Sequence, residues 1–109
     1  MANTFKSVTS GSIGTTLTNV YTCPDDTTTI ILGAGMANTE GNPIGGSIKL
    51  ASGLGADDVF VVKQAPVPVG STVEVMSGNK VVLQEADVLQ FQSDTASSLD
   101  ATISLLEIS

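Results

Sequence analysis

Short stretches of alternating or β-branched apolar residues, each closed by turn-forming residues, recur along most of the chain. In the segment 71–76, for example, Val73 and Val75 alternate with Thr72 and Glu74. A period of two residues marks a strand with one buried face, and no window shows an apolar stripe at helical spacing. The pattern predicts seven or eight short strands, within residues 15–22, 27–37, 44–51, 58–63, 71–76, 81–84, 88–93 and 100–108.

The spacing of these strands points to one architecture. Strands that recur every 8–12 residues or so favour an all-β, single-domain antiparallel β-sandwich of jelly-roll or immunoglobulin-like type. A length of 109 residues fits one such domain. We assign residues 15–109 to the sandwich and residues 1–14 to an N-terminal arm. This small, polar segment is either a frayed terminus or an arm that orders against a neighbouring subunit, anchored by Phe5.

Two segments interrupt the simple alternation. Gly33 and Gly35 fall inside the strongest predicted strand, which suggests a β-bulge or the close approach of another backbone. Pro66 and Pro68 remove two backbone donors, so residues 65–70 cannot lie centrally in a sheet. We expect this segment to form an extended connection along an edge or between sheets.

The charge balance restricts the partners of the chain. Eleven acidic residues stand against four lysines, with no arginine and no histidine, and the formal net charge is −7. Phosphate backbones and anionic membrane surfaces both select basic surfaces, so we expect neither nucleic acid nor a membrane as a partner. The first six residues lack the apolar run of a signal peptide, so we expect synthesis and assembly in a cytoplasm.

Residue types suited to catalysis or metal binding are scarce. Without histidine, the single cysteine, Cys23, has no imidazole to activate it and is expected to be a small buried side chain. The zinc-binding spacings CxxC and HExxH do not occur. Asp25 with Asp26, and Asp57 with Asp58, lack the alternating oxygen ligands of a calcium loop and are expected to shape turns. We therefore predict no enzymatic activity, no catalytic residues, no metal and no cofactor.

Several stretches together resemble a group of small virion structural proteins of cyanophages and other marine tailed bacteriophages. Two of them are distinctive in combination: a Lys-x-Ala-Pro-x-Pro-x-Gly-Ser bend at residues 63–71 and a Leu-Glu-Ile-Ser ending at residues 106–109. Ala86 stands where the group often has glycine, and Lys6 stands alone where it often has a basic run. The stretches that carry the resemblance are residues 3–6, 13–18, 36–39, 61–71, 82–87, 97–100 and 104–109.

The resemblance implies a non-enzymatic component of the virion, made in the host cytoplasm. Our first hypothesis is a capsid decoration, or cement, protein that forms homo-oligomers, a trimer being one option, and packs on the phage major capsid protein or other virion proteins. The alternatives are an adaptor of the neck, tail or baseplate, or a host-receptor or glycan-binding fibre module. Glycan sites present exposed aromatic rings, and the free candidate, Tyr21, is equally suited to the core.

The sequence also suggests where partners would touch. The first element is the N-terminal segment around its one aromatic residue, and the second is the proline-containing connection. The predicted contact residues are Phe5, Lys6, Ala65, Pro66, Val67, Pro68, Val69 and Gly70.

Overall fold

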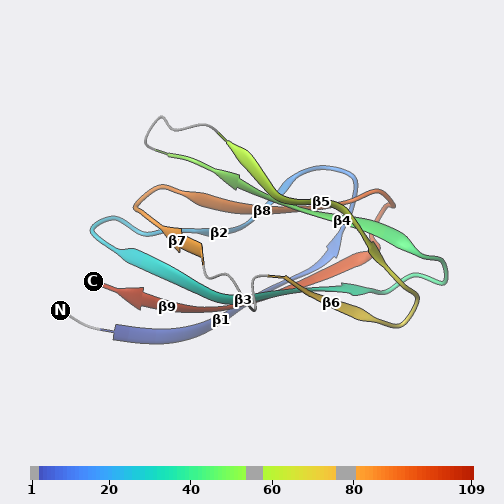
Figure 1. The fold of residues 1–109 in the computed structure, drawn as a ribbon, viewed down its shortest axis with the longest axis horizontal. Helices are drawn as coiled ribbons and strands as arrows, with labels where there is room; N and C mark the ends of the chain where they lie inside the picture. The colour runs from blue at the N-terminus through green and yellow to red at the C-terminus, as the bar shows by residue number, and fades with distance from the viewer. Residues whose placement is uncertain (1–2, 54–57, 76–80) are drawn as a thin grey trace.

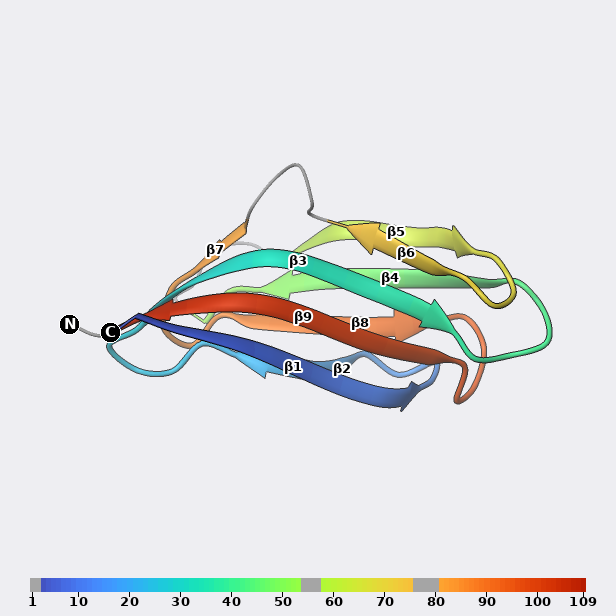
Figure 2. The same ribbon diagram turned by 90° about the horizontal axis from the view of Figure 1, so that it is seen from below.

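The computed structural model describes residues 3–53, 58–75 and 81–109, which fold into two antiparallel sheets packed face to face (Figures 1 and 2). Sheet A contains β1 (Asn3–Ile13), β9 (Leu99–Ile108), β3 (Thr28–Asn38), β6 (Thr72–Val75) and β7 (Val81–Leu83). Sheet B contains β2 (Thr18–Thr22), β8 (Val88–Ser93), β4 (Ile44–Ala51) and β5 (Val59–Val67). The predicted all-β sandwich is confirmed. These ranges contain no helix, and therefore none that could cross a membrane.

The strand order is that of a jelly roll. Sheet A runs β1-β9-β3-β6 and sheet B runs β2-β8-β4-β5, so most connections cross from one sheet to the other. β6 and β7 share one edge position, because β6 pairs with residues 34–37 of β3 and β7 pairs with residues 29–31. The result places β1 and β2 along one margin of the sandwich and β5 and β6 along the other (Figure 2).

Period-two alternation builds the core. On β9, Leu99, Ala101, Ile103 and Leu105 are buried, while Asp100, Thr102 and Ser104 between them are exposed. Phe91 of β8 supplies the largest wholly buried side chain from the opposite sheet. Because successive side chains of a strand point to opposite faces, one apolar residue in two is enough to fill the space between the sheets.

The N-terminal segment differs from its expectation. Residues 3–13, which we assigned to an arm, form β1 and pair with β9 of the same chain. On β1 only Ile13 is buried, with Val8 and Ser10 half-buried, so the strand carries almost no apolar alternation. An edge strand covers little of the core, and small polar residues are sufficient there. For this reason the pattern of β1 looked like that of a terminus.

Both interruptions in the alternation have a structural cause. The register between β3 and β9 shifts between Ile31 and Gly33, which places a bulge at Leu32. A Cβ on Gly33 would lie 2.6 Å from Oε1 of Glu74, so this glycine also permits a close approach. The predicted bulge in this segment is confirmed.

The connection at residues 65–70 also lies where the sequence suggested. Its first three residues end β5, which is an edge strand of sheet B, and the chain then crosses to β6 in sheet A. Pro66 is exposed on that edge, whereas Val67 is wholly buried and its carbonyl accepts a hydrogen bond from Nδ2 of Asn38 at 3.0 Å. Gly70, at a φ of 68°, adopts the left-handed conformation that the turn requires.

Candidate assembly surface

The two predicted contact elements lie on opposite margins of the sandwich. Phe5 and Lys6 belong to β1 of sheet A, and residues 65–70 connect β5 to β6 at the far side (Figure 2). Within the second element Val67 is part of the core, while Pro66, Pro68, Val69 and Gly70 are exposed. The structure therefore does not bring the two elements together into one surface.

A row of four apolar side chains crosses the outer face of sheet A. Phe5 of β1 lies opposite Leu106 of β9, Leu106 lies opposite Ile30 of β3, and Ile30 lies opposite Val82 of β7. We call these four residues the apolar row. Phe5 is 74% exposed and Val82 is 50% exposed, while Leu106 and Ile30 are half-buried. The row is therefore an apolar band open to solvent.

The sequence contained a signal for this row. Three of its strands contain apolar residues that are consecutive in the sequence. These are Leu105 and Leu106, Ile30 and Ile31, and Val81, Val82 and Leu83. Two apolar neighbours on one strand must point to opposite faces, so one of each pair is left on the outside. Only the pairing of the strands shows that these outward residues fall into one register.

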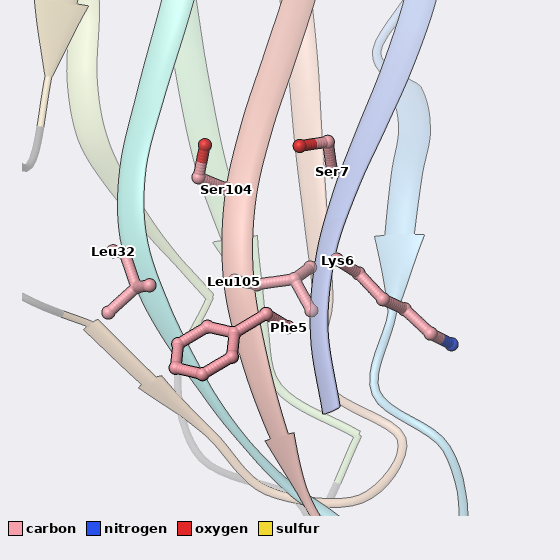
Figure 3. Close-up of a pocket in the computed structure, with 6 residues that line it drawn as sticks. All are labelled: Phe5, Lys6, Ser7, Leu32, Ser104 and Leu105. Atoms are coloured by element: carbon pink, nitrogen blue, oxygen red, sulfur yellow. The ribbon is translucent and has the colours of Figure 1, made fainter. Parts of the chain in front are cut away.

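A shallow hollow lies beside the row. It has a volume of about 250 Å³ and is lined by Phe5, Lys6, Ser7, Leu32, Ser104 and Leu105 (Figure 3). The ring of Phe5 extends over β9 toward Leu32, which occupies the bulge of β3 (Figure 3). Pockets for small organic ligands usually enclose about 300–1,000 Å³. This hollow is smaller than such pockets and is open to solvent.

A chain of polar contacts lies under β1, on the inner side of sheet A. Nζ of Lys6 is 2.9 Å from Oε1 of Glu107, and the Tyr21 hydroxyl donates to Oε2 of Glu107 at 2.6 Å. The hydroxyls of Tyr21 and Thr29 are 2.8 Å apart, and Sγ of Cys23 is 3.3 Å from Oγ1 of Thr29. This inner polar chain joins β1 and β9 to β2 and β3.

The inner polar chain shifts the ionisation of two of its members. Burial raises the pKa of Tyr21, and the hydrogen bond with Glu107 raises it further. The hydrogen bonds from Tyr21 and Lys6 lower the pKa of Glu107 below its ordinary value of 4.5. Within the inner polar chain, Tyr21 is therefore a neutral phenol and Glu107 is an ionised carboxylate. The inner polar chain fixes neighbouring strands in place.

The structure also places the tyrosine, the cysteine and the aspartates that the sequence singled out as candidate sites. Tyr21 is buried, so its ring is no exposed platform for a glycan. Cys23 is also buried. No three acidic or cysteine side chains in the described ranges gather closely enough to hold a metal ion. Asp25 and Asp26 lie in the turn between β2 and β3, whereas Asp57 lies outside the described residues.

A second hollow, on the outer side of sheet B, is polar. It has a volume of about 170 Å³, smaller than the hollow beside Phe5. Its lining contains hydroxyls, amides and one carboxylate, but no aromatic ring. The residues that line it are Thr15, Gly45, Ser47, Gln64, Gln92, Ser93 and Asp94.

Comparison with known proteins reveals a likeness of fold. No family model matches the sequence, and neither does any curated protein. Among solved structures, the chain is similar to one from Bacillus endospore appendages, which are described as a novel family of disulfide-linked pili. The two share 14% sequence identity at a TM-score of 0.54, over 97% of this chain and 84% of the other. At this level of identity the likeness concerns the fold alone.

Proposed function

We propose that this chain is a non-enzymatic structural protein of a tailed-phage particle, and that it decorates the capsid by packing its apolar row against the major capsid protein. The observation that carries the proposal is the row itself. Side chains of four strands come into register on an outward face, where they have no partner within the described part of the chain. Contiguous exposed apolar patches of this kind mark protein interaction sites.

The energetics suit a fastening role. Burying a large exposed apolar side chain such as Phe5 contributes about 1.5–3 kcal/mol. One contact of this size is weak, but a capsid would repeat it at every bound copy of the protein. The hollow beside Phe5 would add shape complementarity to the contact, because a side chain of the partner can enter it between Phe5 and Leu32.

The mode of assembly would differ from that of the pili to which the fold is similar. Those pili are described as disulfide-linked. Here the single cysteine, Cys23, is buried, and its thiol faces the carbonyl oxygens of Thr27 and Leu83. A thiol in this position cannot reach another subunit. We therefore assign assembly to non-covalent packing, in agreement with the sequence resemblance to virion proteins.

The test is the copy number of the chain in purified particles of the phage that encodes it, relative to the major capsid protein, by quantitative mass spectrometry. A ratio near parity is expected for a decoration protein. A ratio of a few per cent would overturn the decoration role and favour an adaptor of the neck, tail or baseplate. Absence from the particle would overturn the structural role altogether.

The apolar row can be tested separately with Phe5→Ser. We expect this variant to fold as well as the wild type, because the ring is 74% exposed, and to lose occupancy on particles assembled with it. The matched control is Phe60→Ser, which removes the other exposed phenylalanine, 39% exposed on β5 between Lys49 and Lys63. Equal occupancy of both variants would contradict a role for the row.

A further inference from the structure

Three of the four edge positions of the sandwich are protected against pairing with another strand. On sheet B, β2 has five residues and a register shift, and β5 carries Lys63, Pro66 and two register shifts. On sheet A, the far edge is divided between β6 with four residues and β7 with three. Short strands, prolines, lysines and bulges are the devices that keep edges unpaired.

The fourth edge, β1, has almost none of these devices. It is 11 residues long, contains no proline and keeps an unbroken register with β9 from Asn3 to Ser10. Its one charged residue, Lys6, is held in an ion pair with Glu107. β9 is the one described strand that pairs with β1, so alternate backbone groups along its other side have no ladder partner in the described ranges.

The charge distribution indicates what can approach this edge. All acidic residues of the chain lie at or after Asp25, and residues 3–22, which form β1, β2 and the connection between them, carry Lys6 as their sole charge. Two copies of a chain with a net charge of −7 repel each other over most of their surfaces. Along residues 3–10 of this margin a second copy can approach without placing acid against acid, whereas Asp100 of β9 accepts a hydrogen bond from the backbone of Ser12 near the other end of β1.

We propose that two copies of this chain pair β1 to β1 in antiparallel fashion about a two-fold axis, with Ser7 opposite Ser7 of the second copy. This inference deepens the proposed function, since it names one partner of the assembling chain as a second copy and gives the interface. Identical strands are self-complementary in this arrangement, as an interface between two equal subunits requires.

The register follows from the side-chain faces. A two-fold axis perpendicular to the sheet keeps the outer faces of both copies on one side, so outward residues must pair with outward residues. Phe5, Ser7 and Thr9 point outward on β1, and Lys6 and Val8 point inward. A centre at Lys6 would oppose two lysines, and a centre at Phe5 would shorten the pairing. A centre at Ser7 pairs Phe5 with Thr9 and uses residues 4–10, which are regular.

The consequence is one continuous sheet with a doubled contact surface. The sheets A of both copies join through β1, and both apolar rows then lie on the same outer face. The pair would therefore present two equal apolar bands to a partner, on either side of the axis.

Cysteine cross-linking tests the register directly. Residues directly opposite in an antiparallel pair have Cα atoms about 4.5–5.5 Å apart, within the range that a disulfide spans. In the proposed pairing the two copies of Thr9 are about 13 Å apart along the strands, beyond that range. Ser7→Cys is therefore expected to form a disulfide-linked dimer on mild oxidation, and Thr9→Cys, also exposed on the same edge, is the matched control.

A second arm uses a mixture. Phe5→Cys mixed with Thr9→Cys is expected to give a linked pair, because these positions oppose each other across the axis. Light scattering after size exclusion should give the wild type twice the mass of the 11.1 kDa chain. A wild type that is monomeric at all concentrations, or a Thr9→Cys variant that links as readily as Ser7→Cys, would overturn the pairing. Because neither readout uses particles, such a failure leaves the virion role standing, and absence from particles leaves the dimer standing.

Discussion

At the scale of single residues, Glu107 joins three strands through one carboxylate. Its carboxylate accepts from Tyr21 with one oxygen and pairs with Lys6 through the other, so β1, β9 and β2 meet at one side chain. Hydrogen bonds to an ionised group contribute more to stability than neutral ones. The attachment of β1 to the sandwich should therefore depend on the charge of Glu107.

Replacing Glu107 with glutamine should lower the free energy of unfolding by about 1–3 kcal/mol at neutral pH, since a charged acceptor is lost. The pKa of Glu107 is lowered on folding, so the unfolded chain takes up the proton first as the pH falls. The stabilisation is complete above the unfolded value of 4.5 and is lost as the pH falls through the lower folded value.

Chemical denaturation of wild type and Glu107→Gln across this pH range measures the effect. The difference between them should shrink below pH 4.5. Glu74→Gln, which removes one exposed carboxylate from β6, is the control and should change little. A difference that stays constant in acid would contradict the contribution of the carboxylate.

Ala86 carries a backbone cost that a glycine would relieve. Its φ is 70°, a left-handed conformation that costs a residue with a Cβ about 1–2 kcal/mol. We expect Ala86→Gly to stabilise the chain by about 0.5–1 kcal/mol, since the extra flexibility of glycine in the unfolded state offsets part of the gain. Thermal unfolding measures this, and Ala96→Gly, at an exposed turn alanine without positive φ, should give no gain.

At the scale of elements, β3 of sheet A and β4 of sheet B are in tight contact at one point. Met36 of β3 is wholly buried and lies against Gly46 of β4. A Cβ on Gly46 would be 2.6 Å from Sδ of Met36, closer than atoms pack, and 3.2 Å from Cε, a tight contact. The absence of a side chain at Gly46 therefore sets the distance between the sheets at this point.

Gly46→Ala should accordingly destabilise the chain by about 1–3 kcal/mol through overpacking. The matched control is Gly41→Ala in the turn between the same two strands, where a Cβ would meet no atom within 4 Å. Denaturant midpoints of the two variants give the comparison. If Gly46→Ala were as stable as Gly41→Ala, the tight packing of Met36 would be contradicted.

The same scale explains how far the sequence could be interpreted. Strands with a buried face, such as β8 and β9, could be predicted from the alternation of apolar and polar residues. The bulge of β3 could be predicted from its glycines. β1 did not, because an edge strand needs few apolar residues. Phe5 could be named as an exposed anchor, but not the apolar row to which it belongs. The apolar row depends on which strands are neighbours in the jelly-roll order. The sequence of a single strand does not indicate its neighbours.

At the scale of the whole molecule, all acidic residues lie in the sequence from Asp25 onward. None of them precedes Asp25, so the margin formed by β1 and β2 is close to neutral on a chain with a net charge of −7. Contact through the neutral margin still brings two acidic bodies together. Their repulsion acts over a distance of about 30 Å at 0.01 M salt but only about 3 Å at 1 M.

Self-association should therefore strengthen as salt is raised from about 0.01 M to 0.5 M, because screening removes this repulsion. Sedimentation equilibrium at several salt concentrations measures the dissociation constant of the pair. A Ser7→Glu variant, which sets two carboxylates near the axis, should associate less at low salt and recover in part at high salt. Association that weakens with salt would point instead to attractive charge contacts.

The pairing of β1 with β9 also governs how the molecule responds to a mechanical load. Asn3 lies opposite Ile108, so the start of β1 and the end of β9 lie side by side at one end of the sandwich (Figure 1). A tension applied between these two residues acts across the strands and opens the hydrogen bonds one after another, as a zipper opens. A load directed along the two strands in opposite directions shears all of these hydrogen bonds together. The β1–β9 ladder should therefore withstand a load along its strands far better than a pull that separates Asn3 from Ile108.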